Sequence, residues 1–327
     1  MILLLGATGL LGHNVLESLL RHGHRVRCVV REGSTIDGAI LALAAEGQLQ
    51  VTKGSVLDDS VLEESLMGCT EVVNCCGVTD MGLDSIDKYR PVNRDLPLRI
   101  ARLLDYQTGG VLVNVSTANT VDPGTVGNPA DENTPFGGPF TGSYYARSKR
   151  EGEKALLDFA ETHLRTRIVI LLPSFMIGPY DRKPSSGKLL KAAYKEPVMV
   201  APPGGKSFVD ARDVASAVLG ALSNPLALGR YLTTGKSLSI KEFYKQEASV
   251  CDYKQLCIGV PRRVCLWVGK LGDWLEQHGR KVLFTSRNVR QLLVEECYDS
   301  SRAHRELGMT STPLEQSIKD FFDYVPR

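Results

Sequence analysis

An apolar N-terminal stretch that runs into three regularly spaced glycines constrains the fold of this chain more than any other feature. Residues 2–5 are all apolar, and Gly6, Gly9 and Gly12 follow at the start of a helical stretch. Gly6 permits a tight turn, Gly9 lets the backbone approach a phosphate, and Gly12 lets the helix pack close to the strand. Because the first N–H groups of a helix lack backbone partners, this turn predicts a site for the diphosphate of a dinucleotide.

Strand-like and helix-like stretches alternate along the first half of the chain. Apolar strands are expected at residues 2–5, 25–30, 49–53, 71–75, 111–115 and 167–172, and helices at 10–21, 60–67, 84–106 and 143–163. Alternation of this kind needs crossover connections between parallel strands, so it predicts an α/β fold with a doubly wound parallel sheet. After Pro173 the chain breaks into shorter pieces with proline and glycine, where we expect loops that face a substrate.

A second set of residues, far from the glycines, carries side chains suited to proton transfer. Tyr145 and Lys149 are four residues apart on an expected helix, so they share one helical face. A free phenol has a pKa of about 10, and a neighbouring ammonium lowers it by favouring the phenolate. A hydroxyl from Ser116 or Thr117, at the end of an apolar strand, can hydrogen-bond a substrate oxygen as charge develops there. These residues predict an acid–base site.

Taken together, these motifs resemble the short-chain dehydrogenase/reductase superfamily in its extended form, which is related to epimerases, dehydratases and dihydroflavonol reductases. The resemblance covers nearly the whole chain and includes, in the same order, segments at 54–58, 73–77, 173–179, 207–215 and 299–308. It implies a Rossmann domain at 1–173, to which 207–235 return, and a smaller C-terminal α/β substrate domain formed by 174–206 and 236–327. The implied catalytic residues are Thr117, Tyr145, Lys149 and Asn93, where Asn93 holds a water against the lysine through a locally distorted helix.

The resemblance also implies a nicotinamide dinucleotide cofactor and assigns its contacts. Besides Tyr145 and Lys149, the implied cofactor-binding residues lie in the glycine turn and after the following strands: Gly6, Thr8, Gly9, Leu10, Leu11, Gly12, Arg31, Ser55, Val56, Cys75, Cys76, Gly77 and Pro173. Arg31 occupies the position where an acidic side chain binds the ribose hydroxyl of NAD and an arginine accepts the 2′-phosphate of NADP. We therefore expect NADP(H) rather than NAD(H), although the adjacent Glu32 offers a carboxylate for that hydroxyl.

The residues after Thr117 separate the reactions of this superfamily. Sugar-nucleotide dehydratases place an Asp-Glu pair there, whereas this chain has Ala118-Asn119, which disfavours elimination. Many epimerases carry an arginine where this chain has Leu172, and the segment 179–185 looks like that of dihydroflavonol-reductase-like proteins. We therefore predict an NADPH-dependent reductase that transfers hydride to a ketone or aldehyde carbonyl, with Tyr145 as proton donor.

Two alternatives to the reductase stay open. The first is a nucleotide-sugar epimerase that acts by transient oxidation, in which one of four arginines binds the diphosphate: Arg262, Arg263, Arg287 or Arg290. The second is a non-catalytic NADP-binding regulatory protein. Members of that kind tend to lose the tyrosine or the lysine, and this chain keeps both Tyr145 and Lys149.

The net charge of the chain bears on which kinds of partner it binds and says little about its fold. The formal net charge is +2, which indicates neither a nucleic-acid nor a membrane surface, although a pI near 8.1 leaves room for a local basic patch. We expect a cytoplasmic protein with a small-molecule substrate. Relatives often pair through the helices that carry Asn93 and Tyr145, so a homodimer is a further expectation.

Cysteine and aromatic residues add two expectations. The chain has eight cysteines with no Cys-x-x-Cys pair, and no histidine is spaced to complete a metal site, so we expect reduced thiols and no metal. Four aromatic residues lie in the part with the fewest motifs, and for each we expect a place in the hydrophobic core rather than in the pocket wall: Tyr244, Trp267, Trp274 and Phe284.

Overall fold

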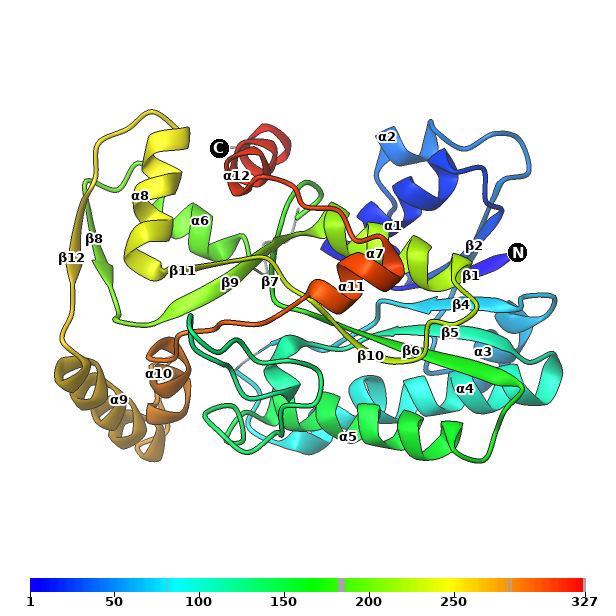
Figure 1. Ribbon diagram of the computed structural model, residues 1–327, viewed down its shortest axis with the longest axis horizontal. Helices are drawn as coiled ribbons and strands as arrows, with labels where there is room; N and C mark the ends of the chain where they lie inside the picture. Colours follow the sequence, from blue (N-terminus) through cyan, green and yellow to red (C-terminus); the bar gives the residue numbers. More distant parts are fainter. Residues whose placement is uncertain (81, 182–185, 281, 283, 326–327) are drawn as a thin grey trace.

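The computed structural model describes residues 1–80, 82–181, 186–280, 282 and 284–325. Its central sheet has seven parallel strands in the order β10-β6-β5-β4-β1-β2-β3 (Figure 1). The strand order reverses at β1, which confirms the predicted doubly wound α/β fold. The strands of this sheet are β1 (Ile2–Leu5), β2 (Val26–Val30), β3 (Leu49–Lys53), β4 (Glu71–Asn74), β5 (Gly110–Val115), β6 (Thr166–Pro173) and β10 (Gly229–Thr233).

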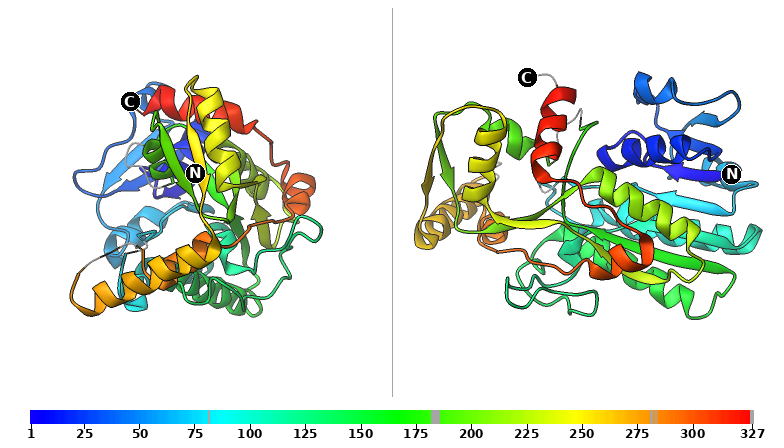
Figure 2. Two further views of the ribbon diagram at one scale, coloured as in Figure 1. Left: turned by 90° about the vertical axis from the view of Figure 1, so that its left-hand side faces the viewer. Right: turned by 45° about the horizontal axis from the view of Figure 1, so that its top comes forward.

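Helices cover both faces of the central sheet, and each face has its own hydrophobic core (Figures 1 and 2). Successive strand residues alternate between the cores: Val111 and Val113 of β5 join one, and Leu112 joins the other. One core includes α1 (Leu10–Arg21), α2 (Gly38–Leu41), α7 (Ala211–Ser223) and α11 (Ser301–Leu307); the other includes α3 (Asp59–Leu66), α4 (Leu96–Gln107) and α5 (Tyr144–Ala160). Three short turns of other helix types complete this part: η1 (Ile86–Lys88), η2 (Pro91–Asp95) and η3 (Ala118–Thr120).

A smaller lobe follows the carboxyl end of β6, at the opposite end of the molecule from the N-terminus (Figure 1). It has a three-stranded sheet of β7 (Phe175–Ile177), β9 (Gly205–Asp210) and β11 (Lys236–Ser239), and a two-stranded sheet of β8 (Val198–Ala201) and β12 (Leu256–Gly259). A third, aromatic core holds this lobe together, with the rings of Phe208 and Phe243 stacked 4.1 Å apart. Its helices are α6 (Lys188–Ala193), α8 (Ile240–Val250), α9 (Arg262–Gln277), α10 (Ser286–Leu292) and α12 (Leu314–Tyr324).

The chain crosses between the two lobes several times after β6. Helix α7 packs on α1, and β10 pairs with β6 at the edge of the central sheet, so most of 207–235 lies with the large lobe. Strand β9 instead pairs with β7 and β11. Helix α11 packs against α7 and β10, although it comes after residue 236. The limits of the two domains remain a prediction, because the lobes exchange segments more often than two ranges describe.

Three global features bear on the expectations from composition. All eight cysteines are free thiols. Within the described ranges, no group of three His, Cys, Asp or Glu side chains is placed to hold a metal ion. In the same ranges, no helix combines the length and the apolar character that crossing a membrane requires.

Candidate active site

The predicted site residues meet at the carboxyl edge of the central sheet. Strand β4 pairs with β1 on one side and with β5 on the other, in a register that places Leu5, Asn74 and Asn114 side by side. The segments that follow these three strands therefore emerge next to one another: the glycine turn after β1, residues 75–77 after β4, and residues 116–117 after β5. This is the edge where open parallel sheets bind their ligands.

In the glycine turn, close backbone contacts exclude a side chain at two of the glycines, whereas the third lies beside open space. A Cβ on Gly6 would lie 2.8 Å from the carbonyl carbon of Cys75, and a Cβ on Gly12 would lie 2.0 Å from the oxygen of Gly6. A Cβ on Gly9 would meet nothing closer than 3.6 Å. No side chain caps the N-terminus of α1, which begins after Gly9. The turn thus fits a diphosphate, because backbone N–H groups and open space coincide there.

The other residues expected to bind the cofactor lie along the same edge. Thr8, Leu10 and Leu11 belong to the glycine turn and the first turn of α1, while Ser55 and Val56 follow β3 and Pro173 ends β6. Arg31 directly follows β2 and is exposed, and its charge acts on the thiol of Cys76. Burial raises the pKa of both Cys75 and Cys76, the latter to about 11, so neither is a reactive thiolate at neutral pH.

Tyr145 lies in the first turn of α5, where the side chain of Ser143 caps the helix. Burial raises the pKa of Tyr145 to about 12, and a hydrogen bond with the Thr117 side chain opposes that rise. We expected Lys149 to lower this pKa, but the lysine is not among its causes. The phenol is therefore protonated at neutral pH, because loss of hydration disfavours the phenolate more than the neighbouring groups stabilise it.

Lys149 is buried one helical turn further along the same face of α5. Its Nζ donates to the carbonyl oxygen of Val115 at 2.9 Å and to that of Cys76 at 3.5 Å, so it joins the ends of β4 and β5. Burial lowers the pKa of Lys149 to about 8. A Cβ on Gly77 would lie only 3.2 Å from this Nζ, so the absence of a side chain there makes room for the ammonium.

The adjacent hydroxyls of Ser116 and Thr117 point to different partners. Ser116 Oγ donates to the carboxylate of Glu153, whereas Thr117 is hydrogen-bonded with Tyr145. Glu153 is fully buried and forms ion pairs with Arg230 at 3.0 Å and Arg150 at 3.3 Å. We missed Glu153 in the sequence, although it is four residues after Lys149 and eight after Tyr145, a spacing that places it on the same helical face.

Asn93 connects the loop after β4 to α5. It lies in η2, which is a π-helix, and its side chain is almost fully buried. Asn93 Nδ2 donates to the Val78 oxygen at 3.1 Å and to Ser148 Oγ at 3.0 Å, and its Oδ1 accepts from the Val78 N–H at 2.9 Å. Ser148 Oγ in turn donates to the main-chain carbonyl oxygen of Tyr145 at 2.8 Å. A locally distorted helix is thus present at Asn93, while its water-holding role stays a prediction.

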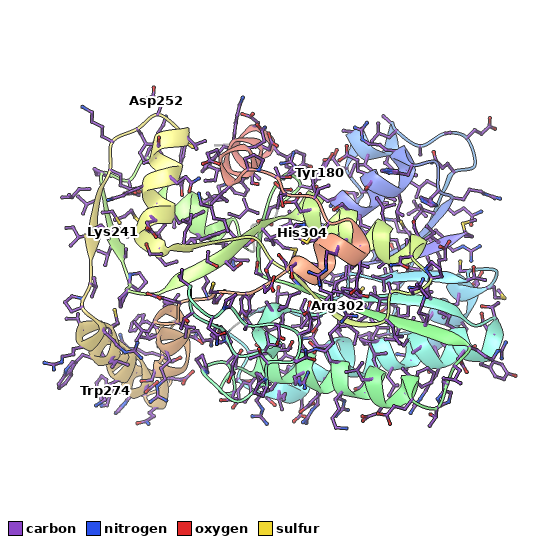
Figure 3. All side chains as sticks on the ribbon, viewed as in Figure 1. Tyr180, Lys241, Asp252, Trp274, Arg302 and His304 are labelled. Carbon is purple, nitrogen blue, oxygen red and sulfur yellow. The ribbon has the colours of Figure 1, made fainter. Side chains whose placement is uncertain are left out.

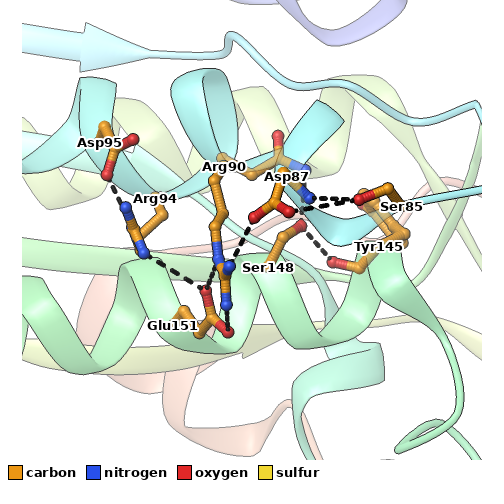
Figure 4. A network of polar contacts seen from close by, with 9 residues as sticks. Ser85, Asp87, Arg90, Arg94, Asp95, Tyr145, Ser148 and Glu151 are labelled. Carbon is orange, nitrogen blue, oxygen red and sulfur yellow. Dashed lines mark hydrogen bonds and ion pairs between the residues drawn. The ribbon is translucent and has the colours of Figure 1, made fainter. Parts of the chain in front are cut away.

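An ion-pair network holds η1 and η2 against α5 on the outer side of this site (Figure 4). The guanidinium of Arg90 binds both oxygens of Glu151, at 2.8 and 2.9 Å, and also pairs with Asp87 at 2.6 Å. Arg94 reaches Glu151 at 3.9 Å and pairs with Asp95 at 2.6 Å. Because the Arg90–Glu151 contact is bidentate, it fixes the relative orientation of the two segments that carry Asn93 and Tyr145.

The smaller lobe meets the site at a void beside Tyr145 that has room for about one water molecule. The lining of this void includes Tyr144 of α5, and Asn288 and Gln291 of α10, together with Leu83, Tyr89 and Ser143. Sequence reasoning did not identify Asn288 and Gln291, because no motif surrounds them. The arginines proposed for a diphosphate are placed differently: Arg262, Arg263 and Arg290 are exposed, and the side chain of Arg287 lies outside the described part. Residues 182–185, used for the reductase resemblance, also lie outside the described residues.

The aromatic residues of the smaller lobe divide into two groups. Tyr244 is buried in the third core, which confirms the prediction for it. Trp267 and Trp274 of α9 and the nearby Phe284 are exposed, so their predicted place in the core was wrong. The reason is that α9 packs through its glycines, as described below. Figure 3 shows Trp274 at the outer end of the smaller lobe.

Comparison with known proteins places these features in a family. The model of the NAD dependent epimerase/dehydratase family matches residues 2–231. Sterol demethylase protein B of Methylococcus capsulatus (strain Bath) is 27% identical to this chain over 328 residues, which is 97% of this chain and 96% of that protein. The bifunctional dihydroflavonol 4-reductase/flavanone 4-reductase of Pyrus communis is 25% identical over 260 residues, 73% of each chain.

Solved structures share the whole fold at low sequence identity. The crystal structure of gox2253 superposes with a TM-score of 0.82 at 22% identity, covering 99% of this chain and 97% of that one. MoeE5 in complex with UDP-glucuronic acid and NAD superposes with a TM-score of 0.76 at 16% identity, covering 99% and 98%. At these identities the likeness concerns the fold alone.

Proposed function

Because this chain belongs to the NAD dependent epimerase/dehydratase family, within the extended short-chain dehydrogenase/reductase superfamily, we propose that it is an NADPH-dependent reductase of ketone or aldehyde carbonyls. The observation that carries this proposal is the state of Tyr145. Its phenol is hydrogen-bonded with Thr117, and burial raises its pKa to about 12. A neutral phenol can donate the proton that reduction of a carbonyl requires.

The proposed reaction assigns a distinct task to each side chain. A nicotinamide cofactor, when bound at the glycine turn, supplies the hydride. Tyr145 gives its phenolic proton to the carbonyl oxygen as that oxygen becomes an alkoxide, and the Thr117 hydroxyl donates a hydrogen bond to the same oxygen. The Lys149 ammonium is held by the Val115 carbonyl beside Gly77, where it is placed to bind the cofactor. Hydrogen bonds of Asn93 to Ser148 and to Val78 hold α5 against the loop after β4.

The preference for NADP(H) rests on Arg31. It follows β2 directly, is exposed, and lies near enough to Cys76 for its charge to act on that thiol. Pairing with a 2′-phosphate is charge-assisted. Replacing Arg31 with Ala should therefore lower the affinity for NADPH by on the order of 10- to 150-fold, and the affinity for NADH by much less. Fluorescence titration of both cofactors measures this, and equal losses for the two would reject the assignment. Glu32→Ala serves as the matched control and should not lower the affinity for NADPH.

The alternative is a nucleotide-sugar epimerase that acts by transient oxidation. It receives less support because Leu172 stands where many epimerases carry an arginine.

One assay distinguishes the two reactions. The purified chain is incubated with NADPH and a panel of aldehydes and ketones, and in parallel with NAD and a panel of nucleotide sugars. We expect stoichiometric loss of NADPH absorbance with at least one carbonyl compound, and none with the Tyr145→Phe variant. Conversion of a nucleotide sugar to its epimer without net change of cofactor would overturn the reductase proposal.

A further inference from the structure

Helix α9 packs with its small residues inward and its large apolar residues outward. Gly269 and Gly272 are its buried residues, and a Cβ on them would lie 3.0 Å from the Ser286 Cα and 2.1 Å from the Phe284 oxygen. Large apolar side chains occupy the opposite side: Val264, Trp267, Val268, Leu271 and Trp274, hereafter the α9 face. Their spacing of three and four residues places them on one stripe of the helix. The α9 face therefore contributes little to the folding of this chain.

A second set of exposed apolar residues lies on the two-stranded sheet of β8 and β12. In β8 and β12, alternate residues are exposed, and the register pairs Val198 with Leu256 and Val200 with Ile258 across the strands. Strand β12 leads into α9, and both lie at the same end of the smaller lobe (Figures 1 and 2). Trp267 is 73% exposed and Trp274 is 54% exposed. Exposed apolar surface on this scale marks a binding site for another molecule.

The charged side chains around the α9 face are mainly basic. From residue 260 to 290, the exposed charged side chains within the described part are Arg262, Arg263, Lys270, Arg280 and Arg290, against the single acid Glu276. On a helical projection, Arg263 and Lys270 border the stripe on the side of the two tryptophans. Lys270 Nζ lies 5.7 Å from the centre of the Trp267 ring. The overall net charge of +2 conceals this local excess.

We propose that the α9 face docks the protein on the surface of an anionic lipid bilayer. A helix with tryptophan, leucine and valine on one side and basic residues beside them lies in the interface of a bilayer, where the apolar side chains enter the headgroup region. The arginines and lysines then face anionic lipid headgroups, which attract basic clusters. The helix lies on the bilayer and does not cross it.

Charge favours this occupant over a second copy of the chain. In a symmetric pair built on the α9 face, the basic side chains of both copies would gather around one interface, with Glu276 of each as the described exposed acid to compensate them. Like charges across an interface oppose association. An anionic bilayer supplies the complementary charge, and it also accommodates tryptophan rings whose N–H groups need a polar environment.

The two tryptophans provide a direct test, because they are the only ones in the chain and both belong to the α9 face. The full-length protein is mixed with vesicles of phosphatidylcholine alone or of phosphatidylcholine with phosphatidylglycerol. We expect a blue shift of tryptophan emission and co-sedimentation with the anionic vesicles only, and both should weaken at high salt. Equal binding to neutral vesicles, or no binding to either kind, would overturn the proposal.

Variants separate the two contributions and test for self-association. Leu271→Gln keeps both tryptophans and should weaken vesicle binding on the order of tenfold, as should the double variant Arg263→Gln/Lys270→Gln. Leu226→Gln, at an apolar residue that is 86% exposed on the large lobe, is the control and should bind as the unmodified protein does. NADPH binding by each variant verifies that it is folded. Unchanged vesicle binding by Leu271→Gln, or a blue shift that grows with protein concentration without vesicles together with dimer sedimentation, refutes bilayer docking.

Discussion

Helices α5 and α9 have nearly the same length, 17 and 16 residues, but they distribute their side chains in opposite ways. Helix α5 buries ionisable residues on one face, where Lys149 and Glu153 have almost no exposure. Helix α9 buries glycines and exposes tryptophans. Each arrangement costs free energy, since burying charge loses hydration and exposing a large apolar side chain forgoes the gain from burial.

The comparison teaches where to look for function in each lobe. On α5 the cost of burial is offset by partners: Lys149 donates to backbone oxygens, and Glu153 pairs with two arginines and Ser116. That network holds in place the residues that we propose to react. On α9, Lys270 lies over the Trp267 ring and His278 packs beside that of Trp274, yet both tryptophans remain more than half exposed. The proposed bilayer would cover them, whereas α5 already has its partners within the fold.

The largest effect is expected from removing the phenolic hydroxyl on α5. Tyr145→Phe should lower turnover by a factor on the order of 10² or more, because the proton donor is lost. Cofactor affinity should remain nearly unchanged. Tyr144→Phe is the matched control, since Tyr144 lines the void beside Tyr145 without the Lys149 spacing, and its effect should be much smaller. Steady-state kinetics of both variants checks this, and equal damage from the two would place the acid elsewhere.

A smaller effect is expected from the hydroxyl that faces Tyr145. Thr117→Val keeps the shape and removes a hydrogen bond to the developing alkoxide, so turnover should fall on the order of tenfold. Ser116→Ala should be milder in turnover, because Ser116 donates to Glu153 instead. Comparing kcat of the two variants measures this difference. A larger loss for Ser116→Ala would mean that the neighbouring hydroxyl contacts the substrate.

The buried lysine predicts the pH dependence of carbonyl reduction. Burial lowers the pKa of Lys149 to about 8, so the ammonium is present below pH 8 and is lost as the pH rises through that value. Because a single ionisation retains only about a tenth of the active form one pH unit above its pKa, kcat/KM should be level below pH 7 and fall about tenfold by pH 9. Tyr145 does not titrate in this range, since its pKa is raised to about 12. A profile that stays flat to pH 9 would contradict this assignment.

The smallest effect is expected on α9. Replacing Trp267 or Trp274 with Gln should change the free energy of unfolding by less than about 0.5 kcal/mol, because these side chains lack the tight packing of a core. Gly272→Ala is the contrasting variant and should destabilise by on the order of 2 kcal/mol, since its Cβ would meet the Phe284 oxygen at 2.1 Å. Urea denaturation measures both. A tryptophan variant as damaging as Gly272→Ala would show that the α9 face is packed within the chain.

The fold could be predicted from the sequence because its evidence is local. Alternating strand and helix stretches specify parallel strands with crossovers, and the spacing of Gly6, Gly9 and Gly12 specifies the turn. The Tyr145–Lys149 pair could be found for the same reason, since a spacing of four fixes a helical face. The same spacing argument could also have predicted Glu153, which follows Lys149 by four residues. Asn288 and Gln291 were not, because their place beside Tyr145 depends on how the smaller lobe meets the large one.

The sequence alone therefore determined the doubly wound sheet, its family and the spacing of the residues expected to react, since short-range backbone geometry decides each of these. Only the tertiary structure decided the environments. It showed that burial outweighs charge at Tyr145, that Ser116 and Thr117 serve different partners, and that α9 turns its tryptophans outward. Sequence does not specify which face of an amphipathic helix is covered, because close contacts of glycines with distant segments fixed that choice in α9.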